Sequence, residues 1–298
     1  MRKILKGIYN DEAGKVPIGI IAVGVFIIAT IGWYFTSDLI HSLDVLFWDE
    51  ANYMQSGQMI TEKFNHSWGP SYAIWYKLVS FFEADRLKLY FLNYRLMTIL
   101  PAIALFVLLA VSNIRLWVSF SVALFFVFAN INLPVWPKVS HYCIFIFLTG
   151  MILAKFIPSK LIKIAFISLF ALNISYARPE FFLTYLALLI LWFIALFFKD
   201  FRDSKSILIS LLLIGFGIGI QFVMGNPLFN FQGDRSALAF AQHFMFNYFQ
   251  WNHIDQDWWI TWMNYYQDLF GNRTSIKDAY QPNETLFHLH FLTNFQNY

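Results

Sequence analysis

The residue pair best suited to chemistry is Asp49-Glu50, which directly follows the apolar segment 46–48. A carboxylate can take a proton from a hydroxyl group, so the pair offers general-base chemistry. The simpler interpretation is structural, because a carboxylate in the first turn of a helix is stabilised by free backbone amides and by the helix dipole. Acidic residues close to a membrane face are costly, and this favours a functional interpretation. Both interpretations stay open on these residues alone.

Three basic residues offer charge for an anion: Arg95, Lys138 and Arg178 are the outward basic residues closest to the ends of predicted membrane spans. Each also has a simpler interpretation as an anchor, because its long side chain can extend to the lipid headgroups. Arg178 differs from the other two because it forms, with Pro179 and Glu180, a turn too short to need charge for solubility. Arg178 is therefore a functional candidate in its own right.

The composition excludes an ordinary water-soluble domain. Hydrophobic residues make up 58% of the 298 residues and charged residues only 13%, whereas soluble domains carry roughly 25% charged residues. The formal net charge of +3 is too small to indicate a nucleic-acid partner. The single cysteine, Cys143, excludes an intramolecular disulfide. The chain is therefore predicted to be an integral membrane protein.

Apolar segments predict about seven transmembrane helices. Roughly 20 apolar residues cross the core of a bilayer, and the first such segment begins at Val16. Short connections separate most of the segments. The predicted spans are 16–36, 89–111, 116–132, 142–157, 161–177, 181–198 and 207–224.

The distribution of lysine and arginine predicts a cytoplasmic N-terminus. Basic residues concentrate near the inner ends of spans. Lys160 and Lys205 lie in connections that this orientation places inside, and Lys163 lies at the inner end of a predicted span. With seven spans, the long segments 37–88 and 225–298 face outward. The short cytoplasmic connections and the small size favour a bacterial inner membrane.

The predicted fold class is an all-α membrane protein in two parts. Residues 1–224 form a seven-span transmembrane module whose first outer loop is 37–88, and residues 225–298 form an aromatic-rich outer segment. Apolar residues at helical spacing in both outer regions predict amphipathic helices on the membrane surface. These residues are Ile74, Trp75, Leu78, Val79, Phe81 and Phe82 in the first outer loop, and Ala237, Phe240, Ala241, Phe244 and Tyr248 in the outer segment.

Three short motifs occur in order along the chain: Asp49-Glu50-Ala51-x-Tyr53 with Gly57 and Gly69-Pro70, then Tyr94-Arg95-Leu96, then Ala177-Arg178-Pro179-Glu180. They resemble motifs of the GT-C superfamily of polytopic glycosyltransferases, including its protein O-mannosyltransferase and aminoarabinose-transferase branches. That superfamily shares a module of seven N-terminal spans, with amphipathic helices in the first outer loop and a long outer segment after the seventh span. This arrangement covers the whole chain.

The resemblance implies an enzyme that moves a sugar from a polyprenyl- or dolichyl-phosphate donor to an acceptor, with inversion at the anomeric carbon. Asp49 matches the general base, with Glu50 as its neighbour and substitute. The leaving lipid phosphate needs cations near the headgroup plane, and this role falls to Arg95, Lys138 and Arg178. Tyr53, His141 and Glu180 are expected to support the same cavity.

The sequence departs from the pattern of that superfamily in the predicted loop 132–141. Many relatives carry there a second acid that helps to hold a divalent metal, but no Asp or Glu occurs between Asp85 and Glu180. His141 could supply a ligand, yet a lone histidine at a span end is more often structural. We expect no cofactor. A divalent metal stays open, although cations that neutralise the phosphate fit better.

The expected partners are the lipid-linked sugar donor, membrane lipid and an acceptor that the sequence does not identify. Relatives commonly continue past this length, so a protein partner that completes the fold is a further expectation. Two other functions stay open. The missing second acid favours a non-catalytic scaffold, and a transporter or flippase of lipid-linked intermediates is disfavoured because the predicted spans carry almost no charge.

Overall fold

The computed structural model describes residues 16–38, 48–62, 69–129, 137–198, 203–227, 234–271 and 283–296. Within these ranges the chain is helical and forms no strand, which confirms the predicted all-α class. The chain divides into two compact units, residues 1–224 and residues 225–298.

Three helices of the described ranges are long and apolar enough to cross a membrane: α2 (Ile18–Phe35), α6 (Arg86–Val111) and α11 (Ser204–Met224). This is the expected feature of an integral membrane protein. Shorter helices occupy the other four predicted spans, so seven membrane crossings are not confirmed. They are α7 (Leu116–Phe128), α8 (Val139–Lys155), α9 (Lys160–Ser175) and α10 (Phe182–Ala195), which follows the 3-10 turn η2 (Pro179–Phe181).

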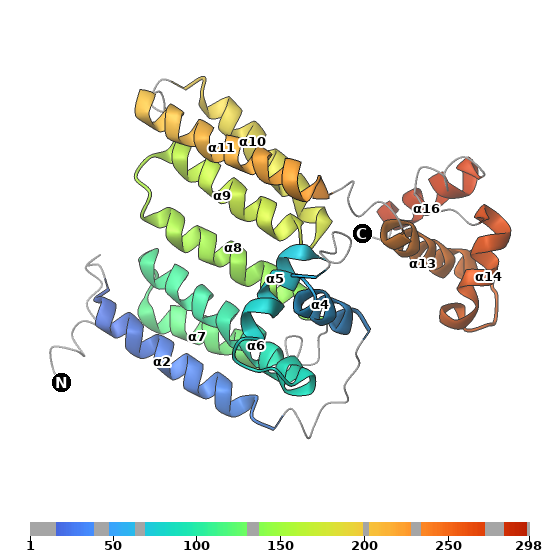
Figure 1. Cartoon of the computed structure of the whole chain (residues 1–298), viewed down its shortest axis with the longest axis horizontal. Coiled ribbons are helices and arrows are strands. Elements are labelled where there is room, and N and C mark those ends of the chain that lie inside the picture. The colour runs from blue at the N-terminus through green and yellow to red at the C-terminus, as the bar shows by residue number, and fades with distance from the viewer. Residues whose placement is uncertain are drawn as a thin grey trace. The chain divides into compact units, whose positions relative to one another are not determined.

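Helices α6 and α9 organise the first unit. α6 contacts α2, α7 and α8, and α9 contacts α8, α10 and α11, so neighbouring helices lie side by side (Figure 1). A small residue permits one close approach, since Gly32 of α2 lies against the side chain of Ile99 on α6. Large apolar side chains such as Phe26, Leu183 and Phe222 remain exposed. Such exposure is expected where lipid covers the surface.

Two short helices, α4 (Trp48–Gln58) and α5 (Pro70–Val79), lie at one end of these longer helices (Figure 1). α5 begins with proline, which suits a first helical turn because that position needs no N–H. The residue before it, Gly69, has a φ of 50°, a conformation that other residues rarely adopt. Gly57 brings α4 close to α5, because a Cβ atom there would lie 2.5 Å from the carbonyl oxygen of Ala73.

The outer side of α5 carries part of the predicted apolar surface. Ile74 and Leu78 are exposed, and so are Phe81 and Phe82 just beyond the helix. Val79, which was expected on the same surface, is instead buried in the core. The exposed side chains fit a helix that lies on a membrane, with Val79 turned toward the bundle.

The second unit is built from α13 (Asp234–Trp251), α14 (Trp258–Phe270) and α16 (Glu284–Gln296). Phe240 and Phe244 of α13 are buried, where they pack with Phe270 of α14 and Phe287 of α16. The face of α13 that carries Phe240 and Phe244 is therefore covered by protein within this unit, and a location of α13 on a membrane surface stays a prediction. The sequence pattern shows that a face is buried, but not whether protein or lipid covers it.

Candidate functional site

The centre of the candidate site is the carboxylate of Glu50, which is only 2% exposed. Its Oε1 atom accepts hydrogen bonds from the hydroxyl of Tyr72 at 2.6 Å, from the amide of Asn93 at 3.0 Å and from the hydroxyl of Tyr76. Its Oε2 atom accepts a hydrogen bond of 2.9 Å from the backbone N–H of Lys138. A buried carboxylate is tolerated only when it is paired and hydrogen-bonded, and four donors meet this condition here.

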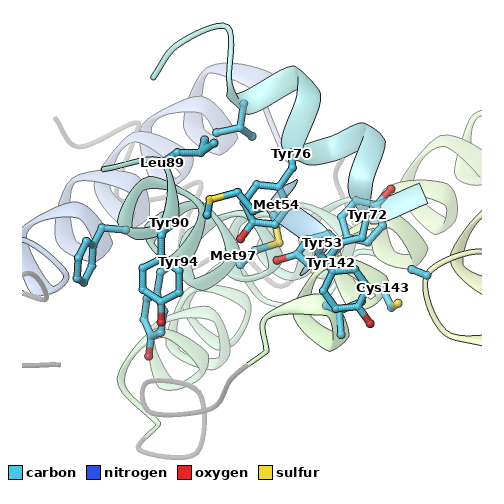
Figure 2. Close-up of a cluster of buried hydrophobic side chains, with 14 of the residues drawn as sticks. Tyr53, Met54, Tyr72, Tyr76, Leu89, Tyr90, Tyr94, Met97, Tyr142 and Cys143 are labelled. Carbon is cyan, nitrogen blue, oxygen red and sulfur yellow. The ribbon is translucent and has the colours of Figure 1, made fainter. Parts of the chain in front are cut away.

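The donors come from three further elements. Tyr72 and Tyr76 lie one turn apart on the same face of α5, so both hydroxyls reach the same oxygen. Asn93 of α6 is held in orientation because its Oδ1 atom accepts a hydrogen bond of 2.7 Å from Trp75 Nε1. The tyrosine rings of α4, α5, α6 and α8 gather in one buried cluster around this network (Figure 2). The cluster thereby ties the short helices α4 and α5 to the bundle.

Lys138 is the cation of the cluster and is itself only 2% exposed. Its Nζ atom lies 4.1 Å from the centre of the Tyr94 ring, a cation–π geometry. Burial lowers the pKa of Lys138 to about 7, although the negative charge of Glu50 opposes the shift. Burial likewise raises the pKa of Glu50 above its ordinary value, against the hydrogen bonds and the charge of Lys138. Removal from water thus disfavours the charged form of both groups.

The interior of the cluster is filled in this structure. The small space bounded by Glu50, Tyr90, Asn93, Tyr94 and Lys138 is too narrow to admit a water molecule. A sugar or a phosphate group therefore has no room between Glu50 and Lys138 in the conformation described. Groups that a substrate can reach at this end of the bundle therefore lie outside the cluster.

Asp49 is such an accessible group. It lies in the first turn of α4 and is partly exposed. The described part of the chain gives its carboxylate no hydrogen-bond or ion-pair partner. The two acids of the predicted pair therefore differ in environment: Glu50 is buried within four hydrogen bonds, whereas Asp49 can meet solvent.

Arg178 lies beside the start of α8. Its Nη2 atom donates a hydrogen bond of 3.0 Å to the hydroxyl of Ser140, two residues after Lys138. Its Nη1 atom lies 3.6 Å from Glu180, and the two side chains are 35% and 60% exposed. The structure therefore brings Arg178 and Glu180 together at the end of the bundle that also carries Lys138. Arg178 remains partly accessible to solvent.

Tyr53 and His141 are both buried near this network. Tyr53 is fully buried and packs edge-on against Tyr72, with ring centres 5.2 Å apart. His141 is 4% exposed, one turn after Lys138 on α8, and lies edge-on to Phe126. Among the described residues, neither ring nitrogen of His141 has a hydrogen-bond partner. Tyr53 thus supports the tyrosine cluster, and His141 is a buried polar group that packs against an aromatic ring.

Arg95 has partners of a different kind. Its Nε atom donates to the carbonyl oxygen of Thr36 at 3.1 Å and its Nη2 atom to that of Ser37 at 2.8 Å. Its guanidinium group also lies 5.0 Å from the centre of the Trp33 ring. These are carbonyls at the C-terminal end of α2, where a cation is favoured by the helix dipole. The contacts favour an anchor for α2, and phosphate binding by Arg95 stays a prediction.

No group of three or more His, Cys, Asp or Glu residues is arranged to hold a metal ion within the described ranges. A divalent metal at Asp49 would need donors beyond Asp49 and Glu50. The oxygens of Glu50 already accept four hydrogen bonds. The described residues therefore offer no fit for a metal at this cluster.

Sequence reasoning missed the hydrogen-bond donors of Glu50, although part of the signal was present. Residues 50, 53, 54 and 57 lie on one face of a helix with the spacing i, i+3, i+4 and i+7, and all four are buried. Glu50 belongs to this buried face of the helix, whereas Asp49 does not. Tyr72 and Tyr76 likewise share the i, i+4 spacing of one helical face. Nothing in the local sequence of Asn93 indicates its role.

The comparisons with known proteins leave the family open. No protein-family model matches the chain, and neither a curated protein nor a solved structure matches it.

Proposed function

We propose that the chain is a membrane glycosyltransferase that moves a sugar from a polyprenyl-phosphate donor to an acceptor on the extracytoplasmic face of the membrane. The observation that carries the proposal is the hydrogen bond between Glu50 and the backbone of Lys138. This bond holds α4 at the start of α8. Asp49 directly precedes Glu50, so its partly exposed carboxylate is held at the end of the bundle that carries Lys138. A base and cations near one membrane face are what transfer from a lipid phosphate requires.

In the proposed reaction Asp49 accepts the proton of an acceptor hydroxyl. The hydroxyl oxygen attacks the anomeric carbon of the donor sugar as the bond between that carbon and the phosphate oxygen breaks. The sugar is transferred with inversion, and the lipid phosphate leaves with the bonding electron pair. Arg178, which is partly exposed, meets the phosphate charge, and Lys138 adds positive potential from within the bundle.

Glu50 has a positioning role in this proposal. Its four hydrogen bonds fix α4 against α5, α6 and α8, and so set the place of Asp49. No metal is assigned a role, because Arg178 and Lys138 neutralise the charge on the leaving phosphate in this proposal. A bacterial inner membrane with the N-terminus in the cytoplasm remains part of the proposal.

One observation favours a second candidate function. The filled space between Glu50 and Lys138 leaves no room for a substrate there. A scaffold subunit that retains the arrangement and binds partner proteins would need no such room. Catalysis by Asp49, outside the filled cluster, is the feature that separates the two functions.

The decisive experiment measures the release of polyprenyl phosphate from a mixed pool of lipid-linked sugars by the purified chain in lipid nanodiscs. Membrane extract supplies acceptors. We expect release by the wild type, none by Asp49→Asn, and release by Arg178→Ala only at raised donor concentration. Chelator should leave the rate unchanged.

The matched control is Glu62→Gln, which removes another exposed carboxylate of the first outer loop and should keep the wild-type rate. If folded wild-type protein releases no carrier phosphate from any donor, the enzymatic function is wrong for this chain and the scaffold function leads. Equal rates for wild type and Asp49→Asn would remove Asp49 as the base.

A further inference from the structure

A second candidate site lies wholly within the second unit, at the turn that joins α13 to α14. A pocket of about 420 Å³ opens there. This volume lies within the range of roughly 300–1,000 Å³ that small-molecule sites occupy. Phe246, Phe249, Ile254 and Trp258 form its apolar wall.

The aromatic wall presents an edge-to-face pair. The rings of Phe246 and Trp258 lie 5.4 Å apart at an angle of 73°, and Phe246 is 42% exposed. Aromatic rings that line an open pocket offer apolar surface to a ligand. The C–H face of a sugar ring is a ligand with an apolar side of matching size.

The remaining lining residues are polar but carry no fixed charge: Gln250, His253 and Gln256. The Oε1 atom of Gln256 accepts a hydrogen bond of 3.3 Å from the hydroxyl of Tyr265, which leaves its amide N–H groups to donate. The side chain of Gln250 has no hydrogen-bond partner in the described part of the chain. Amides both donate and accept, as sugar hydroxyls do.

His253 is held in an uncommon backbone conformation. Its φ is 50°, in the left-handed region, where glycine or asparagine is the usual residue after a helix. The turn itself is closed by backbone hydrogen bonds from His253 N–H to the Gln250 carbonyl and from Ile254 N–H to the Phe249 carbonyl. Glycine would therefore serve the turn better than histidine does. Strained residues of this kind cluster at ligand sites, and the side chain of His253 lines the pocket.

From this combination we propose that the pocket between α13 and α14 binds a neutral carbohydrate. None of the residues that line it within the described ranges is Asp, Glu, Lys or Arg. A phosphate or carboxylate ligand would call for a cation, and an amine would call for an acid. A polyhydroxylated ring with one apolar face needs what the pocket supplies: aromatic surface, two amides and an imidazole. The pocket belongs to a different unit of the chain from the cluster at Glu50, and the proposal does not depend on the proposed transfer reaction.

The test is saturation-transfer NMR with the full chain in phospholipid nanodiscs, which avoids detergents that carry sugar headgroups. The probes are methyl β-glucoside, methyl N-acetylglucosaminide, cellobiose and phosphocholine. We expect at least one glycoside to bind at about 10 mM or below, with strongest saturation on its ring C–H protons, and phosphocholine to show no signal. A signal from phosphocholine alone, or from no probe, overturns the proposal.

Two substitutions locate the binding. Gln250→Ala and His253→Gly should each weaken the glycoside about tenfold, as expected for the loss of one or two hydrogen bonds. His253→Gly should keep or raise thermal stability because it relieves the left-handed conformation. The matched controls are Gln267→Ala, an exposed glutamine of α14, and Asn113→Gly, which relieves a φ of 60° in the first unit. Unchanged affinity in both pocket variants would show that the glycoside binds elsewhere and would overturn the assignment.

Discussion

The Oε2 atom of Glu50 accepts a hydrogen bond of 2.9 Å from the backbone N–H of Lys138, although the residues lie 88 positions apart. The bond joins α4 to the residue directly before α8. Because the donor is a backbone group, no substitution of Lys138 other than proline removes it. The side chains of Glu50 and Lys138 can therefore be altered separately.

The substitution Glu50→Gln should destabilise the protein. Its carbonyl oxygen can serve the three donors at the Oε1 position, but its NH₂ group then faces the N–H of Lys138. Two donors in contact leave one buried group unsatisfied, which costs about 1–3 kcal/mol. Thermal unfolding in nanodiscs should show a lower midpoint for Glu50→Gln and no change for Glu62→Gln. Equal midpoints would mean that the network contributes little to stability.

The pKa of Lys138 predicts a pH dependence of stability. Burial lowers this pKa from 10.5 to about 7 in the folded chain, so between these values the unfolded chain binds more protons. Stability should therefore rise as the pH increases from about 7 toward 10.5. In Lys138→Met this part of the rise should disappear, as measured by unfolding midpoints across the range. The same pH profile of stability in the wild type and in Lys138→Met would show that Lys138 does not cause the rise.

Arg95 should act as an anchor for α2. Arg95→Lys keeps the charge but cannot donate to the carbonyls of Thr36 and Ser37 in the same forked geometry. We expect a loss of about 1–2 kcal/mol in stability, with donor binding unchanged in the folded variant. Arg86→Lys, at the exposed start of the same helix, is the control. Weaker donor binding without a stability change would instead support the predicted phosphate role.

Gly57 should be intolerant of a side chain. In Gly57→Ala the new Cβ atom would lie 2.5 Å from the Ala73 carbonyl oxygen and 2.7 Å from the Tyr76 Cβ atom. α4 and α5 would have to separate, at a cost of roughly 1–3 kcal/mol. Gly215→Ala is the control, because nothing lies within 4 Å of its Cβ position. The unfolding midpoints of the two variants test this contrast, and similar midpoints would count against close packing of α4 on α5.

The sequence predicts the helices better than it predicts their contacts. Each apolar segment carries its own signal, so every predicted span contains a helix, although only three helices meet the length and hydropathy of a membrane crossing. The position of the Asp49-Glu50 pair at the start of a helix was also predictable. The meeting of Glu50 with Asn93 and Lys138 was not, because these contacts join residues 43 and 88 positions apart. Such contacts depend on how whole helices pack.

The four donors around Glu50 also have a consequence for ancestry. An acceptor buried among donors from three other elements cannot change alone without leaving unpaired groups, so substitutions there must be concerted. Distant homologues of this chain should therefore keep the acid of α4, the two tyrosines one turn apart on α5 and the asparagine of α6 as a set. That spatial signature can identify kinship where overall sequence similarity has decayed.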